Sequence, residues 1–156
     1  MKFKRVLQIT AIIFFLAFVA IQFARPDFAN PPVTQSETLE AAIQVPGNVA
    51  AILSRSCADC HSNQTNYPWY SSFQPAAGFL ADHIKEGRRH LNFSVYNTYD
   101  QRKKSRKLDE ICEQVQTKEM PLASYLWIHR NAKLSDEEAK ILCDWTEAER
   151  AKLNTD

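Results

Sequence analysis

The sequence predicts an all-α protein, in which one helical domain follows a single N-terminal transmembrane helix. Three observations support this class. The segment Val6–Ala24 is uncharged over 19 residues, and later segments repeat apolar residues with helical spacing. No segment alternates apolar and polar residues as a half-buried strand does. The chain has 156 residues, which leaves room for one domain beside an anchor and a connection.

The N-terminal segment has the length and the flanking charges of a membrane anchor. At about 1.5 Å per residue it spans a hydrocarbon core of about 30 Å. Basic residues precede it, namely Lys2, Lys4 and Arg5, and such residues mark the cytoplasmic side of a membrane. The residues before Ala20 and Ala24 do not form the small-residue site that signal cleavage needs. We therefore expect a retained single-pass anchor over residues 1–24, with the remaining chain outside the cytoplasm.

The rest of the chain divides into a connection and a domain. Residues 25–45 hold three prolines and no sustained periodicity, which indicates a linker. Residues 46–156 then form the domain, with fifteen Lys or Arg and fifteen Asp or Glu residues. This balanced charge gives no indication of nucleic acid as a partner.

Apolar stripes predict four helices in the domain. They contain the segments 49–56, 80–87, 108–115 and 139–146. Asn48 is the expected N-cap of the first helix, and Pro75 is expected at the first position of the second. Ser135 and Glu138 have the spacing of a capping box at the start of the last helix.

The motif Cys57-Ala58-Asp59-Cys60-His61 carries the clearest chemistry. Two thiols three positions apart, at the end of a helix, can reach the two vinyl groups of one haem, and the adjacent imidazole then points at the iron. The pattern C-x-x-C-H is typical of c-type haem attachment. We therefore expect one covalently attached haem c per chain, with His61 as an iron ligand.

Two other uses of this cysteine spacing are weaker here. A thioredoxin-like thiol–disulfide oxidoreductase needs a βαβ context, and the sequence offers no strand. A zinc site needs a second ligand pair, but Cys112 and Cys143 lie 31 residues apart.

The second axial ligand of such a haem iron would be a methionine or a histidine. Met1 falls on the wrong side of the membrane, so a thioether ligand would have to be Met120. It lies between two helical stretches, and Pro121 stiffens the backbone that presents it. A core methionine is the alternative reading. Three histidines are rival ligands, namely His83, His90 and His129.

The remaining two cysteines lie on apolar helical faces in an oxidising compartment. Once haem takes Cys57 and Cys60, Cys112 and Cys143 are expected to form a disulfide that joins two helices. Two separate buried cysteines are the alternative.

Several uncommon runs together resemble the haem-binding-domain family of bacterial, membrane-tethered monohaem c-type cytochromes. They are CADCHSNQTNYPWYSSFQP, HIKEGRRHLNFS and MPLASYLWIHRNAKLS, followed by a closing helix with CDW. The resemblance covers about Arg25–Arg150. It implies a cytochrome-c-like helical fold, with haem on Cys57, Cys60 and His61 and with Met120 on the opposite side. In a bacterium, this domain is expected in the periplasm.

In the resembling proteins, the aromatic loop that follows the C-x-x-C-H motif covers a haem edge. Tyr67 and Trp69 lie in that loop, and each can offer an apolar face to a porphyrin and a polar atom to a propionate. An ordinary aromatic satellite core is the alternative reading of these residues.

These features together predict an electron carrier, not an enzyme. Its partners are the membrane and a redox protein that the sequence does not name, inside or outside a larger membrane complex. Two alternatives stay open: a haem-based sensor or small-ligand binder with a labile sixth ligand, and a thiol oxidoreductase without haem.

Overall fold

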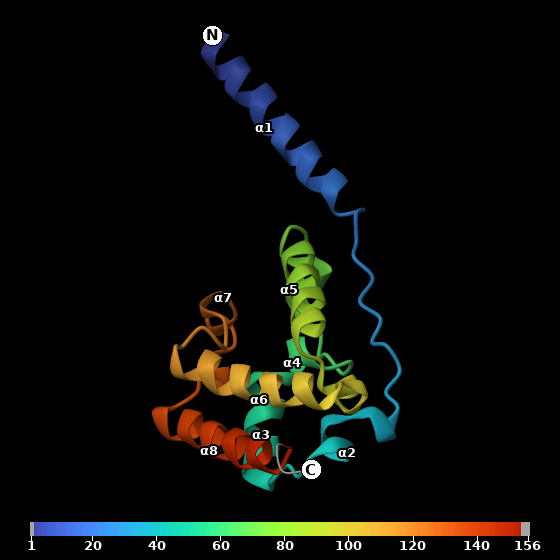
Figure 1. Ribbon diagram of the computed structural model, residues 1–156. Helices are drawn as coiled ribbons and strands as arrows, with labels where there is room; N and C mark the ends of the chain where they lie inside the picture. The colour runs from blue at the N-terminus through green and yellow to red at the C-terminus, as the bar shows by residue number, and fades with distance from the viewer. Residues whose placement is uncertain (1, 154–156) are drawn as a thin grey trace.

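A computed structural model describes residues 2–153, which form helices joined by loops with no strand among them. Helix α1 (Lys2–Ile21) stands apart from the other elements, and none of its side chains is buried (Figure 1). By length and composition, it is the one helix among these residues that could cross a membrane. The predicted all-α class, with one apolar N-terminal helix, is confirmed.

The core of the domain lies among α3 (Gly47–Ser56), α6 (Gln101–Gln116) and α8 (Asp136–Leu153). Helices α6 and α8 run side by side and contribute the fully buried residues Leu108 and Leu142 (Figure 1). The capping box forms as predicted: the amide of Glu138 donates to Ser135 Oγ at 3.1 Å, and the amide of Ser135 donates to Glu138 Oε2 at 2.9 Å. Helix α3 begins one residue before Asn48, which therefore lies in its first turn and is not its N-cap.

Helix α5 (Ala76–His90) follows Pro75, which takes the N-cap position, and packs against the one-turn helix α4 (Ala58–His61). Short helices complete the domain: η1 (Gln35–Glu37), α2 (Leu39–Ala42), η2 (Trp69–Ser72), η3 (Phe93–Thr98), α7 (Ala123–Leu126) and η4 (Arg130–Ala132).

The segment 25–45 differs from the expected free linker. It contains η1 and α2, and Leu39 and Ile43 are buried in the hydrophobic core. Asn30 further ties it to the domain, because its side chain exchanges hydrogen bonds with the backbone of Thr65 at 3.0 and 3.2 Å. The apolar side chains were too few to give a helical period, but they suffice to dock the segment onto the domain.

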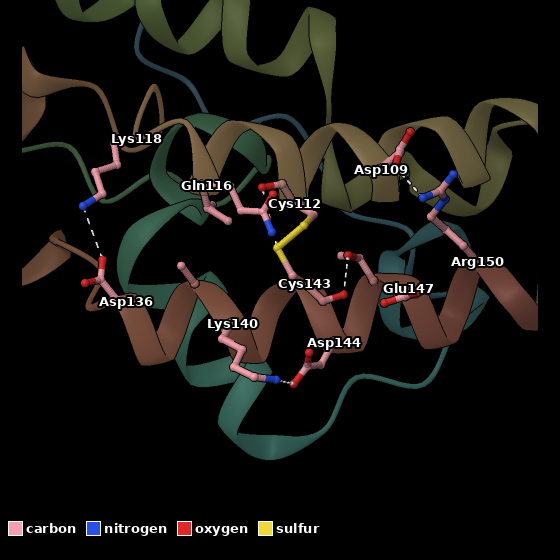
Figure 2. A pocket seen from close by; sticks show the side chains of 13 residues that line it. Asp109, Cys112, Gln116, Lys118, Asp136, Lys140, Cys143, Asp144, Glu147 and Arg150 are labelled. Carbon is pink, nitrogen blue, oxygen red and sulfur yellow. Dashed lines mark hydrogen bonds and ion pairs between the residues drawn. A yellow bond between two sulfur atoms is a disulfide. The ribbon is translucent and has the colours of Figure 1, made fainter.

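A disulfide joins the two helices of the core. Cys112 on α6 and Cys143 on α8 form the pair that the sequence analysis expects, with Cα atoms 4.7 Å apart (Figure 2). Ion pairs flank it along the same cleft, between Arg150 and Asp109 and, at 3.3 Å, between Lys118 and Asp136. The two helices are therefore held together covalently near the middle of their contact.

Candidate functional site

A cavity of about 570 Å³ lies among α4, α5, α6 and the segment that leads into α7. This volume falls in the range of about 300–1,000 Å³ that is typical of ligand sites. Its walls are mostly apolar and include Leu53, Leu91, Phe93, Ile111 and Leu122. The four predicted haem residues all line it, namely Cys57, Cys60, His61 and Met120. The fold thus brings together residues that lie up to 63 positions apart, from Cys57 to Met120.

The first three of these residues share one helical turn. The chain leaves α3 at Cys57, and the amide of His61 then donates to the Cys57 carbonyl at 3.0 Å. Asp59, in the same turn, also lines the cavity and organises the next loop. Its backbone carbonyl accepts from the Thr65 hydroxyl at 2.6 Å, and its carboxylate accepts from the Asn66 amide at 3.0 Å.

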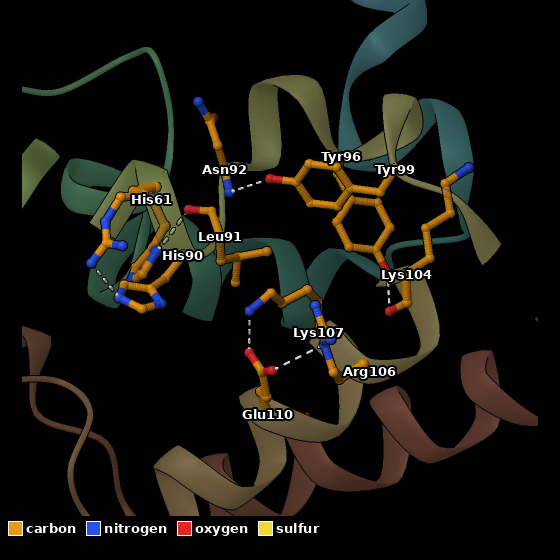
Figure 3. Close-up of polar contacts among 11 residues, drawn as sticks. His61, His90, Leu91, Asn92, Tyr96, Tyr99, Lys104, Arg106, Lys107 and Glu110 are labelled. Carbon is orange, nitrogen blue, oxygen red and sulfur yellow. Dashed lines mark hydrogen bonds and ion pairs between the residues drawn. The ribbon is translucent and has the colours of Figure 1, made fainter. Parts of the chain in front are cut away.

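The imidazole of His61 is oriented by the backbone. Its Nδ1 atom lies 3.0 Å from the carbonyl oxygen of Leu91, as Figure 3 shows. Because a carbonyl only accepts, Nδ1 carries the proton and Nε2 is left as the metal-binding atom. Burial lowers the pKa of His61, which favours the neutral ring that a metal ion requires.

Gly87 allows α5 to lie directly on the C-x-x-C-H turn. A Cβ atom at this position would lie 2.6 Å from the carbonyl oxygen of Cys60, closer than atoms can approach. A side chain would therefore push α5 away from α4 and open the cavity wall that they share.

Met120 reaches the cavity through the turn that ends α6. Lys118 adopts a left-handed conformation with φ 60°. The amides of Lys118 and Glu119 donate back to Val115 and Gln114 at 3.4 and 3.0 Å, which is the pattern of a Schellman motif. The Met120 amide also donates to the Gln114 carbonyl, at 3.1 Å. The position of the thioether therefore depends on this turn.

The rival histidines differ in where they lie. His129 does not line the cavity; its Nε2 atom is 2.9 Å from the Tyr70 hydroxyl, and its ring stacks on Tyr125 with centroids 4.2 Å apart. His83 and His90 do line the cavity. The Nδ1 atom of His83 is 2.8 Å from the Phe79 carbonyl, so His83 also directs its Nε2 atom away from its own helix backbone. Met120 and His83 are the stronger candidates for a second ligand.

Tyr67 and Trp69 are not brought to the cavity. The Tyr67 hydroxyl donates to Asn30 at 3.0 Å and its ring packs against Phe28, so the docked segment 25–45 draws it away. The Trp69 side chain is 72% exposed. Neither residue lines the cavity, and their contact with a haem edge stays a prediction from the family resemblance.

Tyr125 lines the cavity in their place, and no sequence pattern indicated it. Its hydroxyl donates to Asp59 Oδ2 at 2.9 Å, which ties the start of α7 to the C-x-x-C-H turn. Burial, together with the neighbouring Asp59 carboxylate, raises the pKa of Tyr125, so the phenol stays protonated as a donor.

The two free thiols are held in a protonated state. Burial raises the pKa of Cys57 to about 12, and burial with the nearby Asp59 carboxylate raises the pKa of Cys60 to about 11. A redox-active cysteine requires the opposite shift, because the thiolate is the nucleophile. Across residues 2–153, no cluster of three or more His, Cys, Asp or Glu side chains forms a separate metal site.

A helical domain that gathers two thiols, one imidazole and one thioether around an apolar cavity has the residues of a haem-binding protein. The family comparison agrees: the family model described as haem-binding domain matches residues 16–148, and the chain belongs to that family. Membership supports haem as the cofactor. No curated protein and no solved structure matches the chain.

Proposed function

We propose that this protein is a monohaem c-type cytochrome that carries electrons at the periplasmic face of the inner membrane. Cys57 and Cys60 would hold the haem through thioether bonds, and His61 Nε2 and the Met120 sulfur would ligate its iron. The observation that carries the proposal is that these four residues line one apolar cavity, in which Leu91 fixes the direction of His61.

The bound haem iron supplies one-electron chemistry between Fe(III) and Fe(II). The residues of the chain tune and protect this couple. The apolar walls exclude water, the Leu91 carbonyl keeps the His61 ring in its metal-binding tautomer, and thioether ligation by Met120 raises the reduction potential.

Covalent attachment is tested by haem staining of the denatured full-length protein. Haem that stays on the chain after denaturation supports thioether bonds, and it should be lost from a Cys57→Ala, Cys60→Ala double variant. A wild-type protein that loses its haem on denaturation contradicts c-type attachment. The same result would still be consistent with non-covalent haem binding by the domain.

Axial ligation is tested with carbon monoxide and three single variants. Both axial positions are filled in the proposed carrier, so the reduced wild type should bind CO poorly. Met120→Ala should open the iron to CO and remove the weak absorption band of the iron–sulfur bond, whereas His129→Ala should change neither. If His83→Ala alone opens the iron, the carrier has two histidine ligands. A wild type that binds CO readily supports the sensor or ligand binder instead.

We further propose that residues 1–24 are a retained anchor, supported by the length and apolar composition of α1. The intact mass of the protein purified from membranes should equal that of the full chain plus one haem. A chain that begins after Ala20 or Ala24 contradicts retention.

A further inference from the structure

Five large apolar side chains are exposed on the domain, away from its core. They are Trp69 at 72%, Phe73 at 55%, Phe79 at 56%, Trp127 at 80% and Ile128 at 58% exposed, and we call them the aromatic patch. Exposed aromatic residues that gather at one place mark an interaction surface more often than a scattered few do. Trp145, by contrast, is 6% exposed and belongs to the core.

The members of the patch are linked through the fold, although they come from three segments. The rings of Trp69 and Phe73 contact each other edge to face, with centroids 6.2 Å apart. The amide of Ala77 donates to the Phe73 carbonyl at 2.8 Å, which joins the backbone of Phe73 to the first turn of α5, where Phe79 lies. The bond between Tyr70 and His129, at 2.9 Å, joins η2 to the segment that holds Trp127 and Ile128.

The patch lies beside the end of α1. Gln22 bonds twice to the backbone of Gln74: its side-chain oxygen accepts from the amide at 3.0 Å, and its side-chain nitrogen donates to the carbonyl at 3.2 Å. The Gln74 side chain donates in turn to the Ala24 carbonyl at 2.5 Å. Figure 1 shows the start of α5 next to the end of α1, with α7 extending toward the same side.

The length of α1 sets the level of these contacts relative to a bilayer. The uncharged segment Val6–Ala24, which includes most of α1 and the turn after it, has 19 residues and at about 1.5 Å each spans a hydrocarbon core of about 30 Å. Ala24, and Gln74 bonded to it, then lie where the core meets the headgroups. Phe73, next to Gln74 in sequence, stands at the same boundary.

We propose that the aromatic patch inserts into the headgroup region of the membrane that α1 crosses, so that the haem domain lies on the lipid surface. Tryptophan suits this place, because its ring is apolar and its N–H finds polar partners at the interface. The proposal rests on the anchoring part of the proposed function. It needs no basic surface, so it applies to zwitterionic lipid.

The test uses the full haem-loaded chain in phosphatidylcholine nanodiscs that contain a phosphatidylcholine with a photoactivatable diazirine near the headgroup. After illumination, mass spectrometry locates the lipid cross-links. We expect them in α1 and in peptides that contain the patch, at several times the level in α8 peptides around Lys140. Cross-links in α1 alone would contradict the contact between the patch and the membrane. The patch would then be assigned to contact with another protein. A lack of cross-links in α1 overturns the anchor, and the patch proposal with it.

A variant makes the assignment specific to these side chains. Phe73→Ser with Trp127→Ser should keep the haem absorption spectrum and the α1 cross-links but lose most cross-links in the domain. Lys140→Ser, at an exposed site on α8, is the matched control and should change neither. Unchanged domain cross-links in the double variant would contradict insertion of the patch.

Discussion

Among single residues, Lys107 combines burial with a charge close to the imidazole of His61, the proposed iron ligand. Its side chain is only 8% exposed and pairs with Glu110, whose side chain lines the cavity (Figure 3). The positive charge of Lys107 is one of the groups that lower the pKa of His61, after the larger effect of burial. The same charge should favour Fe(II) over Fe(III), because the reduced haem carries one positive charge less.

Replacing Lys107 by methionine should therefore lower the reduction potential of the bound haem. The change removes a cation near His61 and leaves Arg106, at 3.4 Å, as the remaining partner of the Glu110 carboxylate. It should also cost about 1 kcal/mol of stability, because one partly exposed ion pair is lost. Potentiometric titration with optical detection measures the shift.

The matched control for this prediction is Lys107→Met combined with Glu110→Gln. Removing both charges should restore most of the potential, because a nearby cation and a nearby anion are then removed together. A single variant with an unchanged or higher potential would show that Lys107 does not act on the iron.

At the scale of elements, the contact between α4 and α5 depends on one missing side chain. Gly87→Ala should destabilise the haem-loaded protein by about 1–3 kcal/mol, because its Cβ would meet the Cys60 carbonyl at 2.6 Å. The same shift should reduce the fraction of chains that carry haem. Chemical denaturation and the ratio of haem to protein measure the two effects.

Gly78 lies on the same helix and provides the control. A Cβ there would meet only the side-chain amide of Gln74, at 3.2 Å. Gly78→Ala should therefore remain within about 1 kcal/mol of the wild type and keep its haem. Equal stability of the two alanine variants would refute a special role for the close approach at Gly87.

The turn that ends α6 contains a second local constraint. Lys118 adopts a left-handed conformation, which costs a residue with a side chain about 1–2 kcal/mol more than it costs glycine. Lys118→Gly should therefore be more stable than Lys118→Ala by about 1 kcal/mol. Both variants lose the exposed ion pair with Asp136, so their difference isolates the backbone term. Denaturation midpoints of the two variants test this, and an alanine variant as stable as the glycine variant would contradict it.

Across the whole molecule, the sequence predicted the helices better than the way in which they contact one another. The capping box at Ser135 and the C-x-x-C-H turn are local, so neighbouring residues determine them. The docking of Leu39 into the core and the approach of α5 at Gly87 are not local. They arise from contacts between distant segments that leave no period in the sequence.

The same distinction explains the site. His61 and Met120 could be proposed from their own motifs, whereas the Leu91 carbonyl that orients His61 belongs to the backbone and carries no residue signal. Tyr67 and Trp69 were assigned to the cavity because they follow the motif closely. The contact of Tyr67 with Asn30 directs it elsewhere.

The disulfide contributes to stability at this largest scale. Cys112→Ala with Cys143→Ala should lower the free energy of unfolding by about 2–4 kcal/mol, because the unfolded chain loses a crosslink across 31 residues. Guanidinium denaturation of both proteins measures the loss. Reduction of the wild type should give the same destabilisation, since haem thioethers are not reduced by thiols. A double variant as stable as the wild type would mean that the bridge adds nothing to the fold.

Maturation of this chain requires opposite treatment of its cysteines in one compartment. Four thiols can pair in three ways, and two of those pairings would join the haem motif to α6 and α8. Under the proposed attachment, Cys57 and Cys60 must stay reduced until haem arrives, while Cys112 and Cys143 must be oxidised. The fold separates the two tasks in space, because the second pair lies between α6 and α8 and the first lines the haem cavity. Once the thioethers form, Cys57 and Cys60 can no longer form disulfides with Cys112 or Cys143. Haem attachment would therefore also protect the correct disulfide.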